Sequence, residues 1–208
     1  MNYLIVDGEG FTKKGNQPYE LGYCIMNEEG ETLIKRDFFF PKFMRQNAGA
    51  TFASQNFDYY MERKDTGEYI TCWTPEDFAK VFINDYKLHK PKAFLAWKAS
   101  VDWNFVSSLI GEDKLVLMFD RWYDISNGAA DSSDYIKWCY DNDGLSEKGY
   151  PRFNVDTCLQ YLYGETYRPE VHRGIEDCAD EANLAFHFGF ANYEKWTTDA
   201  GQLWRRFK

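Results

Sequence analysis

The chain has 208 residues, a formal net charge of −9, 44% hydrophobic residues, 27% charged residues and 19% aromatic residues. These values are ordinary for a globular domain and exclude collagen-like, low-complexity and intrinsically disordered classes. No run approaches the roughly 18 apolar residues of a membrane-spanning helix, so no membrane partner is expected. The acidic balance disfavours extensive non-specific binding to duplex phosphates, although bound divalent cations can reverse the charge at one site.

The cysteines predict a reducing compartment. They are five in number and form no C-x-x-C pair, so we expect reduced, mostly buried thiols in a cytoplasmic protein. The chain begins Met-Asn-Tyr-Leu-Ile-Val-Asp, without a basic segment before an apolar one, so no signal peptide is expected. On composition alone, the aromatic residues fit a bulky core better than a stacking surface for bases.

The first part of the chain predicts an antiparallel meander. Three short apolar runs are typical of strands, at residues 2–7, 20–27 and 31–40. Residues 28–30 (Glu-Glu-Gly) fit a tight turn, and Pro41 ends the third run. Residues 42–73 are polar and aromatic, with partial helix expected over 47–63.

Helices and strands alternate in the remainder of the chain. Thr74 as N-cap and Pro75 at the first helical position predict a helix with one apolar face. Further strands are expected over 93–97 and 114–119, and further helices over 102–110, 135–140, 155–163, 175–189 and 193–205. Strands followed by alternating helices and strands predict an α/β fold with a central mixed sheet. We expect a single domain over 1–208, with elaborations at 42–73 and 120–152 and a C-terminal helix within 191–208.

Two carboxylates stand at the end of the first predicted strand. Asp7 and Glu9 are two residues apart, and side chains alternate along a strand, so both project from one face. Adjacent carboxylates repel one another unless they are protonated or neutralised by a cation. The pair therefore fits either an exposed polar strand end or part of a metal site, and a D-x-E pattern alone does not decide between them.

Asp102 follows the apolar strand at 93–97 and opens the next predicted helix. In this position a carboxylate interacts favourably with the helix dipole, an effect worth about 0.3–1 kcal/mol. That ordinary role is sufficient to explain Asp102 when it is taken alone.

A third block surrounds the start of the predicted helix at 175–189. His172 lies in the loop before the helix, and Asp177 follows five residues later in its first turn. Taken alone, His172 fits a surface or capping residue, and Asp180 and Glu181 are expected on a solvated helix face. Small residues that would let this helix press closely on a sheet recur at Ala179, Ala182 and Ala185.

Together, the three blocks resemble the DEDDh 3′→5′ exonucleases of the ribonuclease H-like superfamily, the group that includes polymerase proofreading domains, ribonuclease T and oligoribonuclease. The D-x-E on the first strand, an Asp after the fourth, and a His with an Asp five residues later occur in the family's order. The resemblance extends over residues 2–189. It implies a ribonuclease H-like fold, in which helices cover both faces of the mixed sheet.

The resemblance also implies a mechanism. Its two divalent metal ions, Mg²⁺ or Mn²⁺, would be bound by Asp7, Glu9, Asp102 and Asp177. His172 would be the general base, and a histidine with an unperturbed pKa of about 6.5 can accept a proton near neutral pH. Both ions prefer hard oxygen ligands, and a pair of them can stabilise an in-line displacement. The implied reaction is hydrolysis at the 3′ end of single-stranded DNA or RNA, which releases nucleoside 5′-monophosphates.

Gly10, Phe11 and Lys98 are candidate substrate contacts. Phe11 could stack on a terminal base or pack in the core, and Lys98 could bind a phosphate or be solvated. Trp97-Lys98 stands where relatives often have His-Asn, which leaves the orientation of the loop before Asp102 open.

Two other functions fit the same pattern. A nuclease fold can serve as a nucleic-acid-binding or protein-binding module without useful catalysis, and an endonuclease or integrase-like relative would share the fold. Retention of all five polar residues favours an enzyme, and the spacing of His172 and Asp177 favours the exonuclease. A homodimer and a polymerase partner stay open. The choice between DNA and RNA also stays open, because a metal site contacts phosphates and not the 2′-hydroxyl.

Overall fold

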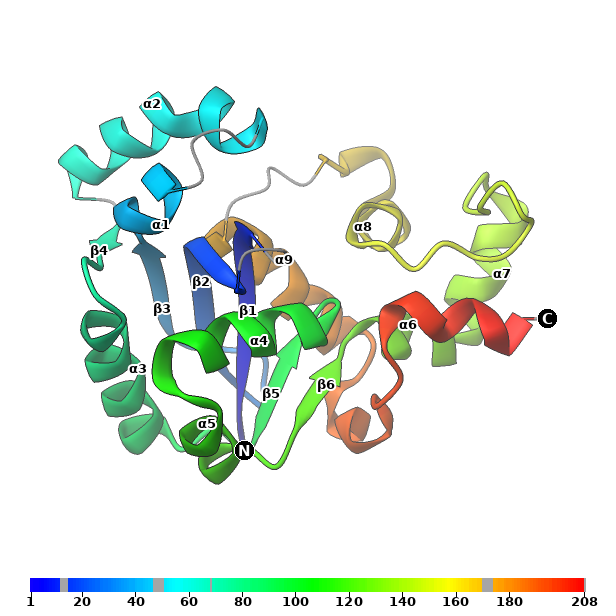
Figure 1. Ribbon diagram of the computed structural model, residues 1–208. Coiled ribbons are helices and arrows are strands. Elements are labelled where there is room, and N and C mark those ends of the chain that lie inside the picture. Colours follow the sequence, from blue (N-terminus) through cyan, green and yellow to red (C-terminus); the bar gives the residue numbers. More distant parts are fainter. Residues whose placement is uncertain (12–14, 47–50, 68, 170–173, 208) are drawn as a thin grey trace.

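A six-stranded mixed sheet forms the centre of the molecule (Figure 1). The structure is a computed structural model, and it describes residues 1–11, 15–46, 51–67, 69–169 and 174–207. The strands are β1 (Asn2–Phe11), β2 (Gln17–Asn27), β3 (Thr32–Phe39), β4 (Ile70–Thr71), β5 (Ala93–Ala96) and β6 (Trp122–Asp124). Their order across the sheet is β4-β3-β2-β1-β5-β6.

The strand directions agree with the predicted mixed sheet. β1, β2 and β3 form the antiparallel meander, and β4 adds to β3 in parallel. β5 runs parallel to β1, and β6 runs parallel to β5. The carboxyl ends of β1, β5 and β6 therefore lie at one edge of the sheet, which is the edge where open α/β sheets bind ligands.

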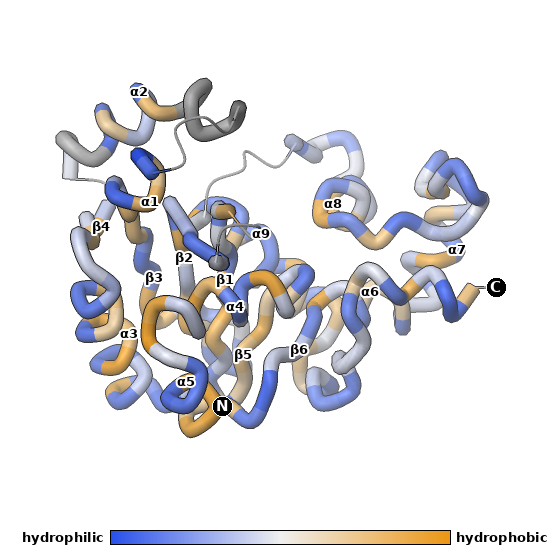
Figure 2. Tube along the Cα trace, viewed as in Figure 1, coloured by the Kyte–Doolittle hydropathy of each residue, from blue (hydrophilic) through white to orange (hydrophobic). Residues whose placement is uncertain are grey.

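Helices cover both faces of this sheet. They are α1 (Pro41–Gln46), α2 (Thr51–Thr66), α3 (Pro75–His89), α4 (Ala99–Ile110), α5 (Glu112–Met118), α6 (Ser126–Asp131), α7 (Ser133–Asp141), α8 (Val155–Tyr163) and α9 (Gly174–His187). Leu4 and Val6 of β1 pack with α3, α4 and α5, whereas Tyr3 and Ile5 pack with α8 and α9. Figure 2 shows hydrophobic residues along β5, at the centre of the molecule.

The predicted start of α3 is confirmed in detail. Thr74 is the N-cap with extended backbone, and Pro75 begins the helix. The Asp77 carboxylate accepts hydrogen bonds from the backbone N–H groups of Trp73 and Thr74, each at 3.0 Å. These contacts satisfy donors that a helix leaves without intrahelical partners, which explains why the helix begins here.

The strand expected over 114–119 is wrong, because residues 114–118 lie in α5 and Phe119 is its C-cap. Leu115 is buried there, while Val116 and Leu117 are 49% and 86% exposed. The charged and unbranched residues around them favour a helix, and the short apolar run by itself is compatible with either structure. The strand at this place in the fold is β6, whose three residues are too few to show a pattern.

The single helix expected within 191–208 is also wrong. In this region the described residues form two short 3₁₀ segments, η3 (Phe190–Lys195) and η4 (Ala200–Phe207). Between them, Trp196 is 1% exposed, and its carbonyl oxygen accepts a hydrogen bond from the Asp124 N–H of β6 at 2.8 Å. Burial of Trp196 against the sheet edge interrupts the helical path that the amphipathic pattern predicts.

The segment 42–73 forms α1, α2 and β4, and Figure 1 shows α1 and α2 beyond the end of β3. Tyr60 and Tyr69 of this segment pack on Tyr19 and Phe39 in a separate small core. All five cysteines are buried and unbridged, as predicted. No helix within the described ranges has the length and apolar composition needed to cross a membrane.

Candidate functional site

The carboxyl end of β1 brings Asp7 and Glu9 to the face of the sheet that α9 covers. The residues before them are buried, and the period of the strand places Ile5, Asp7 and Glu9 on the same side. Gly8 faces the other way, towards α4, where an added Cβ would lie 2.9 Å from the Phe105 ring. A glycine at this position therefore allows α4 to pack against the strand.

Helix α9 reaches these carboxylates because its first turn lies directly on β2. A Cβ added to Gly22 would lie 2.3 Å from the carbonyl carbon of Gly174, so only glycine permits this approach. Ala182 and Ala185 are buried on the sheet side, as predicted, whereas Ala179 is only partly buried. Small residues at the contact thus set the distance between the helix and the sheet.

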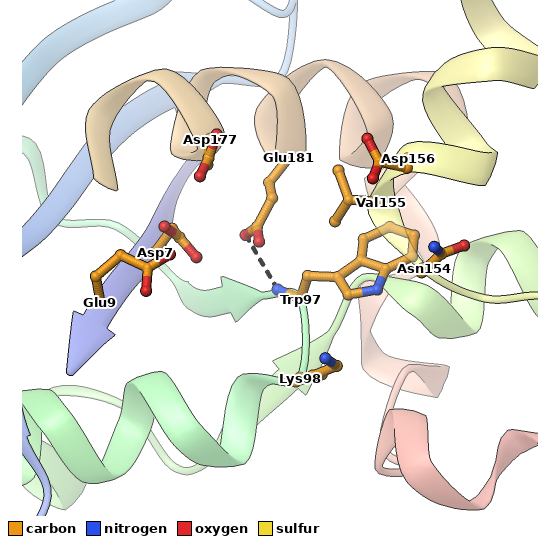
Figure 3. A pocket seen from close by; sticks show the side chains of 9 residues that line it. All are labelled: Asp7, Glu9, Trp97, Lys98, Asn154, Val155, Asp156, Asp177 and Glu181. Carbon is orange, nitrogen blue, oxygen red and sulfur yellow. Dashed lines mark hydrogen bonds between the residues drawn. The ribbon is translucent and has the colours of Figure 1, made fainter. Parts of the chain in front are cut away.

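This packing places Asp177, which is 2% exposed, beside Asp7 and Glu9. One carboxylate oxygen from each of the three residues lies within 4.8 Å of the others. Figure 3 shows the three side chains directed towards one another from β1 and α9. Three hard oxygen donors at this spacing fit the ligand preference of a divalent cation such as Mg²⁺ or Mn²⁺.

Asp102 reaches the same region from the opposite face of the sheet. It is 3% exposed, and its Oδ1 accepts a hydrogen bond from the Gly8 N–H at 3.0 Å. Burial raises the pKa of Asp102 well above its usual range, and the negative charges of Glu9 and Asp124 add to this effect. Asp102 is thus next to the backbone between Asp7 and Glu9, although it is outside the cluster of three.

A cavity of about 310 Å³ opens beside these carboxylates. Five carboxylates line it: Asp7, Glu9, Asp156, Asp177 and Glu181. Among the described residues that line it, Lys98 is the one cation. An anionic ligand would therefore need additional positive charge at this site, such as bound metal ions.

Lys98 lines the cavity from the turn that joins β5 to α4, and it is exposed. Its φ of 57° and ψ of 44° are left-handed, a conformation that residues other than glycine seldom adopt. The neighbouring Trp97 is 5% exposed, and its indole N–H donates to the Phe153 carbonyl at 3.1 Å. The structure thus gives the orientation of the Trp97–Lys98 loop before Asp102, which the sequence left open.

Two residues that line the cavity, Glu181 and Asp156, were not predicted as site residues from the sequence. The expectation of a solvated Glu181 is wrong, because Glu181 is 1% exposed and its Oε2 accepts from the Trp97 N–H at 3.0 Å. Its separation from Asp177 is one helical turn, a spacing that could have indicated a shared face. Asp156 begins α8, and its Oδ1 accepts from the Tyr167 hydroxyl at 2.8 Å.

The other predicted contacts lie elsewhere or outside the described residues. A Cβ on Gly10 would lie 2.7 Å from the Phe105 ring and the Gln17 carbonyl oxygen, so packing is sufficient to explain this glycine. The Phe11 ring lies 5.3 Å from the Tyr19 ring and packs with the small core under α2, as its core alternative predicts. His172, the predicted base, falls outside the described residues.

No protein-family model matches the chain, and no curated protein matches it. The class that fold and site define is an α/β protein with a mixed sheet and an acidic cavity at one sheet edge. Asp7, Glu9 and Asp177, which the sequence analysis selected from segments far apart, are neighbours in this structure.

Proposed function

We propose that the protein is a metal-dependent 3′→5′ exonuclease with a ribonuclease H-like fold. It hydrolyses phosphodiester bonds at the 3′ end of single-stranded DNA or RNA and releases nucleoside 5′-monophosphates. The observation that carries this proposal is the convergence of Asp7, Glu9 and Asp177 to within 4.8 Å beside a cavity. The antiparallel meander followed by parallel strands supports the fold assignment.

In this proposal Asp7, Glu9 and Asp177 hold the divalent ions, and Asp102 adds an oxygen donor from α4. When bound, such ions supply charge neutralisation to the phosphate and stabilise both the attacking and leaving oxygens. Without them, the carboxylates that line the cavity would repel the phosphate of a substrate. The acidic net charge of the chain therefore agrees with a requirement for metal.

The remaining roles belong to the protein itself. Lys98 binds a phosphate oxygen, because it brings a cation to the cavity that holds the carboxylates. His172 takes the proton of the attacking water, which is the role that its place in the motif implies. The cavity of about 310 Å³ is within the usual size range of small-ligand pockets, which is compatible with entry of one nucleotide terminus.

The test uses 5′-labelled single-stranded DNA and RNA oligomers with Mg²⁺, Mn²⁺ or chelator. We expect a ladder that shortens one nucleotide at a time from the 3′ end, only with metal. A 3′-phosphate should slow the reaction, because the cavity receives a free 3′ terminus. Cleavage of a circular single strand would identify an endonuclease, and binding without any product would identify a recognition module.

A further inference from the structure

Glu181 is a buried carboxyl that neither the motif nor the proposed chemistry explains. It lies on α9 one turn after Asp177, is 1% exposed, and borders the cavity (Figure 3). A carboxylate withdrawn from water is costly unless hydrogen bonds or charges compensate. We propose that Glu181 is a positioning residue, which fixes the Trp97–Lys98 turn against α9 and so aims Lys98 into the cavity.

The hydrogen bond that carries this proposal joins two distant segments. Glu181 Oε2 accepts from the backbone N–H of Trp97 at 3.0 Å, at the point where β5 has ended and α4 has not begun. The Trp97 side chain is held separately, because its indole N–H donates to the Phe153 carbonyl at 3.1 Å. The backbone of Trp97 is thus hydrogen-bonded to α9, and its indole is hydrogen-bonded to the segment before α8.

The backbone conformation of Lys98 shows why the turn needs these hydrogen bonds. Lys98 has a left-handed backbone, with φ at 57°, although it is not glycine. Strained conformations of this kind persist only where the surrounding structure determines them, and they gather at functional sites. The Glu181 hydrogen bond acts on the residue immediately before Lys98, so it stabilises the turn where the strain is located.

The turn controls two groups of the candidate site at once. Lys98 is the N-cap of α4, and Asp102 lies in the first turn of that helix. Glu181 therefore connects the helix that carries Asp177 to the helix that carries Asp102. This inference rests on the proposed function for its catalytic consequence, but the hydrogen bond itself can be tested without any activity.

The experiment compares Glu181→Gln with Glu181→Leu. Glutamine keeps an oxygen acceptor at the same place without the charge, whereas leucine keeps similar bulk without the acceptor. Asp180→Asn is the matched control, because Asp180 is the preceding residue on α9 and does not line the cavity. Unfolding curves for all three variants establish that each remains folded under the assay conditions.

The first readout is amide hydrogen exchange over residues 97–102, followed by mass spectrometry. We expect faster exchange in Glu181→Leu, exchange close to that of the parent in Glu181→Gln, and no change in Asp180→Asn, because exchange reports local opening of the turn. Equal exchange in parent and leucine variant would overturn the proposal. This result would be informative even if the parent had no nuclease activity.

The second readout separates positioning from metal binding. We expect Glu181→Leu to raise KM about tenfold, the size of one lost hydrogen bond, with most of this loss recovered by glutamine. Calorimetric titration with Mn²⁺ should give the same affinity for the parent and the glutamine variant, because both keep the acceptor that holds the turn before Asp102. Loss of Mn²⁺ affinity in Glu181→Gln would make Glu181 a metal ligand instead. Absence of activity in the parent would contradict the proposed function alone.

Discussion

Two groups of carboxylates lie on the α9 face of the sheet, and their surroundings differ. The first group is the cluster of Asp7, Glu9 and Asp177, which borders the cavity at the end of β1. The buried acidic pair, Glu20 and Asp37, lies on β2 and β3, where the exposed fractions are 0% and 8%. The groups are adjacent, since Glu9 and Glu20 are direct partners in the β1–β2 register.

The surroundings of the buried acidic pair favour neutral or hydrogen-bonded carboxyls. The Tyr60 hydroxyl of α2 donates to Glu20 Oε2 at 2.6 Å. Burial raises the pKa of Asp37 to about 9, with the negative charges of Glu20 and Glu176 adding to the rise and Arg63 opposing it. The same residue types therefore serve different purposes, because α2 covers one group and leaves the other next to a cavity.

Gly22 marks the boundary between the two groups. In the sheet register it is the partner of Asp7 on one side and of Asp37 on the other. The first turn of α9, at Gly174, lies directly on it. The start of the helix therefore lies over the strand between Asp7 and Asp37, whereas Glu9 and Glu20 remain direct neighbours in the sheet.

The largest expected effect is the loss of activity when a carboxylate of the Asp7, Glu9 and Asp177 cluster is replaced. If the proposed function holds, Asp177→Asn or Asp7→Asn should abolish most nuclease activity and leave the fold intact, because each would remove a ligand from the proposed metal site. In the parent, Mn²⁺ should raise the melting temperature, since a ligand at a hundredfold excess over its Kd contributes about 2.7 kcal/mol. Melting curves with Mn²⁺ and with chelator test this; a variant with parental turnover would remove its residue from the site.

His172→Ala should lower turnover by roughly 10²–10⁴-fold, the usual contribution of a positioned acid–base group. Mn²⁺ affinity should change little, because His172 is assigned as a base and not as a ligand. Single-turnover kinetics and calorimetry measure the two quantities separately. Complete loss of Mn²⁺ binding would show that His172 is a ligand.

Gly22→Ala should affect both groups at once. The added Cβ would lie 2.3 Å from the Gly174 backbone, so α9 must move away from β2. Overpacking of this kind costs about 1–3 kcal/mol, and displacement of Asp177 should also lower activity. Urea unfolding and the oligomer assay check the two effects; unchanged stability with full activity would mean that α9 does not need this close approach.

The smallest expected effect on activity concerns the buried acidic pair, whose substitution should change stability alone. With a pKa raised to about 9, Asp37 keeps its proton on folding, whereas the unfolded chain loses it above about pH 4. This difference lowers stability as pH rises from about 4 to 9. Asp37→Asn should therefore raise the melting temperature at pH 8, have little effect near pH 4, and leave Mn²⁺ binding and activity unchanged. Equal melting temperatures at pH 8 would contradict the assigned protonation state.

Local signals in the sequence were sufficient for many of the elements. The meander of β1 to β3, the start of α3 at Thr74, and α8 over residues 155–163 all follow from apolar periodicity and capping. The same reasoning placed Asp7 and Glu9 on one face, because a strand alternates its side chains. These features depend on residues close together in the chain.

What the sequence alone did not determine is the burial of particular carboxyls and the path of short segments. Glu181 was expected on a solvated helix face, and Glu20 was assigned only to a strand, yet Trp97 and Tyr60, 84 and 40 residues away, donate hydrogen bonds to them. Likewise β6 is too short for any pattern and is defined by its pairing with β5. Tertiary packing decided these features, because the free energy of a buried carboxyl depends on which distant donors surround it and not on its neighbours in the chain.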